Sequence, residues 1–134
     1  MTLKKVIRLN LIDKRITQPE RGWLLQLMPL LTEVMGAVND IHVVTLEPGV
    51  IRGNHYHKLM TEALLPLSDG LRIVWHDADG RYEEITKAGE SLYIFAPTIP
   101  HAMRNDSPVT ALGVAFGNTA FNPDAQDRYP HPLF

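Results

Sequence analysis

The stretch "PGVIRGNHYHKLMTE", residues 48 to 62, places two histidines and a glutamate at short spacings. His55 and His57 are two residues apart, so a β-strand through them directs both side chains to one face. Glu62 follows five residues after the second histidine. A turn that folds "TEALL" back beside the first strand would bring its carboxylate to the same place. His101, much later in the chain, can supply a third imidazole.

These four side chains predict a metal site. A mixed set of nitrogen and oxygen ligands suits zinc, iron, nickel, manganese or cobalt more than calcium. We therefore expect one divalent transition metal, bound by His55, His57, Glu62 and His101. Two other interpretations remain open: a metal-free polar cluster with a catalytic role, or polar residues at strand ends that never meet.

Short β-rich runs surround this stretch, and turn signals separate them. From Ile41 onward the runs are "IHVVTLE", "GVIRGNHYH", "TEALLPLS", "LRIVWHD", "RYEEITK", "SLYIFAP", "HAMRN" and "TALGVAFG". The segment "WHDADGRYE" predicts a hairpin, because Asp-Gly lies between two β-patterned runs. Many short strands at this spacing favour an all-β sandwich or barrel with little helix over a βαβ sheet.

The two ends of the chain differ from this pattern. "KKVIRLNLI" predicts a first strand. "RGWLLQLMPLLTEVMG" is ambiguous: its first half can form a short strand ended by Pro29, and its second half can form a short helix ended by Gly36. The tail "FNPDAQDRYPHPLF" is rich in proline, so we expect it to lie extended over the surface without continuing a sheet. The organisation expected is a single domain over residues 1–134, with N-terminal strands in 1–47, the motif-bearing barrel in 48–118 and the tail in 119–134.

Composition excludes several classes of function. The 134 residues carry a formal net charge of -2, which predicts no strong attraction to nucleic acid or to an anionic membrane. The sequence has no cysteine, which excludes disulfides, thiolate zinc sites and a cysteine nucleophile, and fits a cytoplasmic location. Charges interrupt the apolar residues of "MTLKKVIRLNLIDKR", a pattern unlike a signal peptide or a membrane span.

The stretch from Gly49 to Glu62 resembles the first signature of the cupin superfamily. In both, a glycine is followed by five residues, then His-x-His, then four residues and a glutamate. "GESLYIFAPTIPHAMRN" is similar to the second signature, with Gly89, Pro97, His101 and Asn105 in the corresponding positions. The resemblance implies a double-stranded β-helix, or jelly-roll, barrel that holds a metal on the four ligands named above.

Three departures from the cupin signatures fall near turns. Gly70, which closes the first signature, comes one residue late, and Thr98 stands where the second signature usually has glycine. The spacing between Gly89 and Pro97 is also longer than usual. All three leave the four expected ligands intact.

A narrower resemblance is to the cupin domain of bifunctional capsular polysaccharide enzymes, which epimerise and reduce UDP-2-acetamido-2,6-dideoxy-hexuloses. The matching residues are Arg52, Gly53, Asn54, His55 and His57, followed by Phe121, Pro123, Asp127 and Tyr129. "RGNHYHK" also resembles the core of dTDP-sugar 3,5-epimerases and 3,4-ketoisomerases. "ERGWLLQL", with Arg21 and Gly22, is similar to the short strand that opens many of those cupins. "ALLPLSDG" departs from the usual strand of the capsular enzymes.

The resemblance implies action on a nucleotide-linked keto-deoxy sugar, as an epimerase or isomerase in surface polysaccharide biosynthesis. Such reactions start by removing a proton next to a ketone, which needs a base and a group that stabilises the enolate. If the site is metal-free, His55 or His57 can be the base. If both bind metal, another group must act, and the candidates are Tyr56, Lys58, Tyr93 and His76.

Basic residues are the expected contacts for the diphosphate of such a substrate. The candidates are Arg52, Arg21 and Lys58. Strict alternation puts Arg52 on the strand face opposite His55, although a bulge at Gly53 can redirect it. His42 lies outside both signatures, so we interpret it as a half-buried strand residue and not as a ligand.

Two further functions remain open at this point: a non-enzymatic small-molecule-binding or sensor cupin, and a metal-dependent dioxygenase. The expected partners are a small-molecule ligand and a second copy of the chain. A homodimer is predicted because the apolar run "WLLQLMPLL" of the N-terminal strands must be covered.

Overall fold

The computed structural model describes residues 5–134, and nearly all of its regular structure is β-strand. The expected strand over "KKVIRLNLI" begins at Lys4, which lies outside the described residues. The strands are β1 (Ile7–Asn10), β2 (Ile16–Gln18), β3 (Gly22–Leu24), β4 (Asp40–Leu46), β5 (Ile51–Tyr56), β6 (Glu62–Pro66), β7 (Leu71–Asp77), β8 (Gly80–Ile85), β9 (Ser91–Phe95), β10 (His101–Asn105), β11 (Ala111–Gly117) and β12 (Tyr129–Pro130). The helices are the 3-10 helix η1 (Ile12–Lys14) and α1 (Leu27–Met35).

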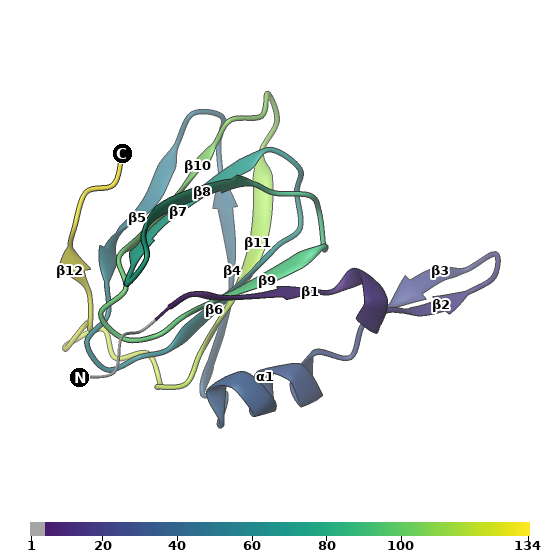
Figure 1. Cartoon of the computed structure of the whole chain (residues 1–134), viewed down its shortest axis with the longest axis horizontal. Helices are drawn as coiled ribbons and strands as arrows, with labels where there is room; N and C mark the ends of the chain where they lie inside the picture. The colour runs from purple at the N-terminus through teal and green to yellow at the C-terminus, as the bar shows by residue number, and fades with distance from the viewer. Residues whose placement is uncertain (1–4) are drawn as a thin grey trace.

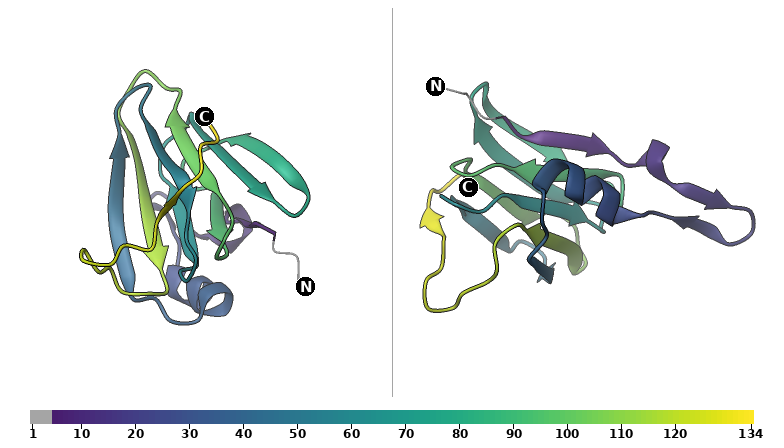
Figure 2. Two further views of the ribbon diagram at one scale, coloured as in Figure 1. Left: turned by 90° about the vertical axis from the view of Figure 1, so that its left-hand side faces the viewer. Right: turned by 90° about the horizontal axis from the view of Figure 1, so that it is seen from below.

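Two five-stranded antiparallel sheets face each other (Figures 1 and 2). The first sheet has the order β1-β9-β6-β11-β4 and the second has the order β12-β5-β10-β7-β8. A separate hairpin, β2–β3, projects away from both sheets (Figure 1). The all-β class with little helix, predicted from the spacing of strands and turns, is confirmed.

Side-chain alternation in the first sheet separates two apolar layers. One set of alternate residues, including Ala63, Leu65 and Phe116, packs against Leu31 and Met35 of helix α1. The residues of the other face point between the sheets and meet the second sheet there. The buried residues of this inner layer are Leu64, Ile73, Trp75, Tyr93, Phe95 and Ile99.

Helix α1 starts earlier than the sequence pattern indicated. Pro29 lies in its first turn and does not end a strand, because first-turn residues need no N–H donor for the helix. The predicted helix end at Gly36 is confirmed. Its φ of +76° is the left-handed conformation that glycine adopts readily, and its N–H donates to the Thr32 carbonyl.

The C-terminal tail adds a strand to the second sheet. Tyr129 pairs with Tyr56 and Pro130 with His55, so the expectation that the tail would not continue a sheet is wrong. A proline is tolerated there because β12 is an edge strand, where one side of the backbone needs no partner. The aromatic rings of Tyr56 and Tyr129 stack with their centroids 5.4 Å apart, which covers the outer face of β5.

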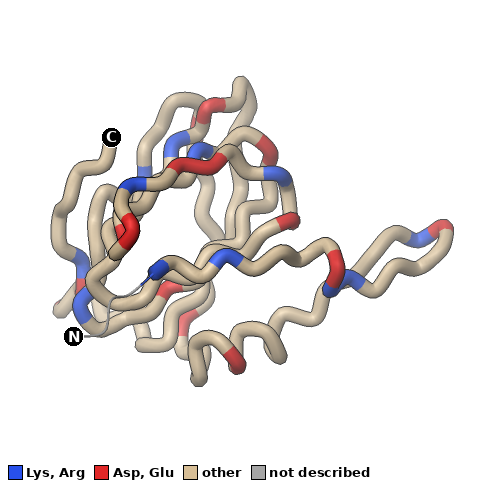
Figure 3. Tube along the Cα trace, viewed as in Figure 1, with Lys and Arg blue, Asp and Glu red and all other residues tan. Residues whose placement is uncertain are grey.

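Basic and acidic residues are interspersed along the chain, with neither sign confined to one region (Figure 3). On the outer face of the second sheet, Arg72 lies between two carboxylates, 2.9 Å from Glu83 and 2.7 Å from Asp106. Hydrogen bonds from Arg104 and Arg72 lower the pKa of Asp106 to about 2. Within residues 5–134, no helix is long and apolar enough to cross a bilayer.

Candidate metal centre and cavity

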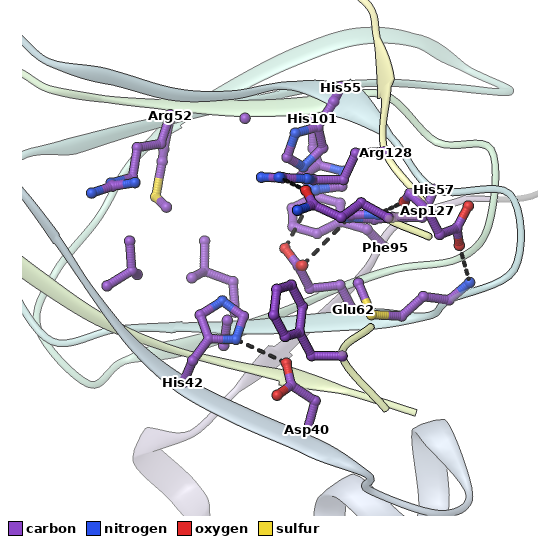
Figure 4. A pocket seen from close by; sticks show the side chains of 18 of the residues that line it. Asp40, His42, Arg52, His55, His57, Glu62, Phe95, His101, Asp127 and Arg128 are labelled. Atoms are coloured by element: carbon purple, nitrogen blue, oxygen red, sulfur yellow. Dashed lines mark hydrogen bonds and ion pairs between the residues drawn. The ribbon is translucent and has the colours of Figure 1, made fainter. Parts of the chain in front are cut away.

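Three histidine side chains converge between the two sheets. His55 and His57 come from β5 and its end, and His101 begins the neighbouring strand β10, where its Cα pairs with that of His55. One ring nitrogen from each imidazole lies within 4.8 Å of the other two (Figure 4). As the sequence predicted, the spacing of two residues between His55 and His57 turns both imidazoles inward.

The glutamate reaches this cluster from the opposite side. Glu62 opens β6, which belongs to the first sheet and not to the sheet of β5. Its two carboxylate oxygens lie 3.4 Å from His57 Nε2 and 3.4 Å from His101 Nε2. The expectation that "TEALL" folds back beside the first histidine strand is wrong, because the turn carries the chain across to the facing sheet. The carboxylate still adjoins two of the three imidazoles.

Hydrogen bonds to backbone carbonyls fix the orientation of two rings. His57 Nδ1 donates to the Asp127 carbonyl at 2.6 Å, and His101 Nδ1 donates to the Ile99 carbonyl at 3.0 Å. The Nε2 atoms of both rings are buried and have no hydrogen-bond partner among residues 5–134. In neutral rings each Nε2 then presents a lone pair toward Glu62. Lone pairs and a carboxylate that converge in a buried space fit a divalent cation, and carbonyl-held rings are typical of metal-binding histidines.

The pKa shifts at this cluster have clear causes. Burial, reinforced by His101 and His57, lowers the pKa of His55 to about 4, so this ring is neutral at neutral pH and free to coordinate. Burial opposes the charged form of His57, but the Glu62 carboxylate outweighs it and raises the pKa of His57. Burial likewise works against ionised Glu62, and the adjacent rings of His101 and His57 overcome it, which holds the pKa of Glu62 below its usual range.

A backbone bulge in β5 lies directly before His55 and sets the direction of the side chains around it. Between the pairs His101–His55 and Ala102–Gly53 the register shifts by one residue, so Asn54 has no partner on β10. Gly53 has φ +86°, and a Cβ atom there would lie 2.8 Å from the His101 carbonyl oxygen. Only glycine allows this close approach. The break in alternation lets Arg52 line the same cavity as His55.

The C-terminal tail holds the loop after β5 in place. The Asp127 carboxylate accepts hydrogen bonds from three consecutive backbone N–H groups, those of Lys58, Leu59 and Met60. Its own carbonyl accepts the His57 hydrogen bond described above. One residue of the tail therefore orients a histidine of the candidate metal centre and the turn that leads to Glu62.

The cavity has a volume of about 930 Å³, and residues of β4 and β5 line it. Apolar side chains such as Leu64, Ile73 and Phe95 form part of its wall. Phe95 stacks on the His101 ring with the centroids 4.3 Å apart. Residues 119–122 and 125–128 of the tail line the other side. The size and the mixed lining suit a small molecule larger than a single sugar.

Several residues predicted to act at the site do not line this cavity. Tyr56 faces outward and stacks on Tyr129, where the ammonium group of Lys58 also lies, 4.2 Å above the ring. Tyr93 is buried in the inner layer, and its hydroxyl donates to Glu84 at 2.6 Å. Burial and Glu84 raise the pKa of Tyr93 to about 12, away from the neutral range that a base requires.

Two more predicted residues lie elsewhere. His76 is exposed on β7, on the face that points away from the first sheet. Arg21 lies in the turn of the projecting β2–β3 hairpin, where its N–H donates to the Gln18 carbonyl. Of the three predicted phosphate contacts, Arg52 lines the cavity, whereas Arg21 and Lys58 do not.

The structure also brings to the cavity three residues that sequence reasoning missed. Arg128 points from the tail toward His55 and His101, and its side chain donates to Gln126 (Figure 4). Asp40 and His42 line the opposite wall from β4, and they are joined by a 2.9 Å contact between Asp40 Oδ2 and His42 Nδ1. The spacing of two in "DIH" was a visible signal, but neither residue belongs to a signature.

Comparisons with known proteins point to one fold. No protein-family model and no curated protein matches the sequence. Among solved structures, a 3,4-ketoisomerase from Helicobacter canadensis is 21% identical, with a TM-score of 0.77 over 92% of this chain and 89% of that chain.

A second similar structure is a variant of the 3,4-ketoisomerase QdtA from Thermoanaerobacterium thermosaccharolyticum in complex with TDP-4-keto-6-deoxyglucose. It is 14% identical, with a TM-score of 0.74 over 96% of this chain and 88% of that chain. The capsular polysaccharide assembling protein CapF from Staphylococcus aureus is 19% identical, with a TM-score of 0.65 over 72% of this chain. The match spans only 29% of the CapF chain. The chain therefore has the cupin-type β-sandwich fold that its two signatures predict.

Proposed function

We propose that this protein is a metal-binding cupin that acts on a nucleotide-linked keto-deoxy sugar, as an epimerase or isomerase of surface polysaccharide biosynthesis in the cytoplasm. The observation that carries the proposal is the composition of the cavity. The His55–His57–His101 cluster lies in a cavity that also includes Arg52 and Arg128. A site for a keto sugar nucleotide needs both parts: one that acts at the ketone and one that binds the diphosphate.

The two arginines are suited to a diphosphate. Arg52 donates from Nε to the Thr45 carbonyl at 2.9 Å, which fixes the side chain and leaves its terminal nitrogens to contact a ligand. Arg128 comes from the tail, so the two guanidinium groups approach the cavity from different segments. Guanidinium groups bind phosphate oxygens in pairs of parallel hydrogen bonds. The fold likeness to 3,4-ketoisomerases over most of both chains supports this ligand class.

The walls around the histidines favour chemistry at a ketone. Leu64, Ile73 and Phe95 give the cavity an apolar wall, which favours holding developing charge by fixed groups over holding it by solvent. A divalent metal bound at the histidine cluster would supply a Lewis acid for the ketone oxygen. His57 and His101 would hold it through Nε2, because Asp127 and Ile99 already occupy their Nδ1 atoms.

The test is proton exchange at the carbon next to the ketone. The zinc-loaded protein is incubated in heavy water with UDP- and dTDP-linked 4-keto-6-deoxy sugars, and C3, C4 and C5 are followed by NMR. We expect the C3 proton to be lost, because epimerisation at C3 and 3,4-keto-isomerisation both pass through an enolate there. Deuterium then enters C3 in an epimerisation and C4 of the 3-keto product in an isomerisation, whereas entry at both C3 and C5 would indicate a 3,5-epimerase. If a folded, metal-loaded protein exchanges none of these positions in any of these sugars, the proposal is wrong and a binding or sensor function gains support.

We also propose that the protein is a homodimer, although the apolar run that suggested it is not the exposed surface. Most of "WLLQLMPLL" is covered within the chain, because Leu31 is buried and Leu25, Leu27 and Leu30 pack against the same core. The apolar side chains that remain exposed in this region include Trp23 and Ile16, which lie on the projecting hairpin. We expect sedimentation at micromolar concentration to give the mass of a dimer, and a monomer would contradict the proposal.

A further inference from the structure

A histidine–carboxylate pair on β4 lies across the cavity from the metal centre. We propose that His42 is the general base that moves the proton next to the ketone and that Asp40 positions its ring. This inference rests on the proposed function, because it assigns the base for the same reaction. A separate base is needed because His55, His57 and His101, when they bind a metal, are not free to take a proton.

The strand register turns both residues of the pair toward the interior. Asp40 and Glu62 both pair with Gly117, one from each side of β11, so the two carboxylates share one face of the sheet, where the Met60 side chain covers Gly117. In the next inward row, His42 pairs with Ala115, which pairs in turn with Leu64. His42, Ala115 and Leu64 line the same cavity as the metal centre. Figure 4 shows His42 on the wall opposite His55 and His101.

The hydrogen bonding of the pair suits a base. The Asp40 carboxylate accepts the Nδ1 proton of His42 at 2.9 Å, which leaves Nε2 without a proton and able to accept one. The side chain of Asp40 is 23% exposed and that of His42 is 52% exposed, so the ring is the more accessible of the two. Within residues 5–134, the ring of His42 has no other hydrogen bond. A partly buried carboxylate that orients an accessible imidazole in this way also stabilises the imidazolium that forms after proton transfer.

The tyrosines and the lysine that the sequence offered as the base are excluded by position. Tyr56 and Lys58 lie on the outer face of β5 with Tyr129, and Tyr93 is buried behind the cavity wall with a raised pKa. Among the described residues that line the cavity, His42 is the one histidine outside the metal centre.

The proposed step transfers a proton from the sugar to His42. Nε2 of His42 takes the proton from the carbon next to the ketone, and the electron pair of that C–H bond forms the C=C bond of the enolate. The ketone π electrons move to the oxygen, which faces the metal centre across the cavity. The imidazolium then returns a proton to carbon, or first exchanges it with solvent. In heavy water each turnover that includes this exchange leaves one deuteron on the sugar.

The experiment compares variants in the heavy-water exchange reaction. We expect His42→Gln to lower kcat for exchange by about 10²–10⁴-fold, the usual contribution of a general base, with little change in KM, zinc content or affinity for UDP and TDP. Added imidazole should restore part of the activity of His42→Ala. Asp40→Asn should lower kcat and Asp40→Glu should recover part of the loss, because a carboxylate again meets Nδ1. The matched control is His76→Gln, which removes an exposed histidine outside the cavity and should leave kcat unchanged.

The outcomes separate this inference from the proposed function. If the wild type exchanges and His42→Gln exchanges equally fast, another group is the base and the inference is wrong while the proposed function stands. A rise in KM alone, or a loss in His42→Ala that imidazole does not relieve, would assign His42 a binding or structural role and also overturn it. If the folded, zinc-loaded wild type exchanges no keto sugar, the proposed function fails and this inference fails with it.

Discussion

His57→Ala is expected to remove most of the bound metal while the protein stays folded. His57 is 4% exposed and directs an unpartnered Nε2 toward Glu62, so its loss removes a ligand from the centre of the site. Loss of an outer-shell partner alone costs about 10–100-fold in metal affinity, and loss of a ligand should exceed that. The fold should persist, because the side chain lines an existing cavity and its removal opens no new void in the apolar layers. Zinc content after loading and desalting gives the measurement, and circular dichroism checks the fold.

The matched control for this variant is His76→Ala. That histidine is exposed on the outer side of β7, so the variant removes an imidazole that could bind zinc nonspecifically and leaves the cavity intact. Its zinc content should equal that of the wild type. Equal zinc content in His57→Ala and wild type, or no zinc uptake by the wild type, would show that the assigned ligands are wrong.

Asn105→Ala is expected to destabilise the fold by about 2–4 kcal/mol, because it leaves several buried polar groups without partners. The side chain is 1% exposed at the end of β10. Its amide nitrogen donates to the carbonyls of Leu46 at 2.9 Å and Val109 at 2.7 Å, and its oxygen accepts from the Ser107 N–H at 2.9 Å. One amide therefore links the end of β4 to the turn between β10 and β11. The change in the midpoint of urea unfolding gives the measurement.

Asn10→Ala is a suitable comparison because Asn10 is exposed and its oxygen makes one local hydrogen bond, 2.9 Å to the Ile12 N–H. We expect a cost under about 1 kcal/mol for this variant. Similar urea midpoints for the two variants would mean that the buried amide network contributes little, contrary to our account of this turn.

The sequence predicted those features that depend on neighbours along the chain. Alternation and turn residues place β7 and β10 at the bounds predicted, Leu71–Asp77 and His101–Asn105. The spacing of His55 and His57 is enough to direct both rings to one side of a strand. The end of helix α1 at Gly36 follows from a conformation that favours glycine. Each of these depends on a few residues and their own backbone geometry.

What the sequence could not predict depends on which strands lie together. Nothing between residues 57 and 62 indicates that the chain crosses to the facing sheet, so Glu62 was expected beside His57 and lies opposite it. His42 resembles an ordinary strand residue until the register of β4 turns it toward the cavity. Arg128 gains its place only because β12 pairs with β5, and a short proline-containing strand gives almost no periodic signal.

The attachment of the tail to β5 has a consequence for the order of folding. The hydrogen bonds of Asp127 to residues 57–60, and those of Asn54 to the end of the tail, join residues that are 67 to 80 positions apart in the chain. Closing such long loops is entropically costly, so these contacts should form late. All three apolar clusters lie between Val6 and Phe116, so the barrel can collapse before the tail attaches. A nascent chain would then form its hydrophobic core first and orient His57 last, so a metal at the proposed site would bind after the core has formed and would not nucleate folding.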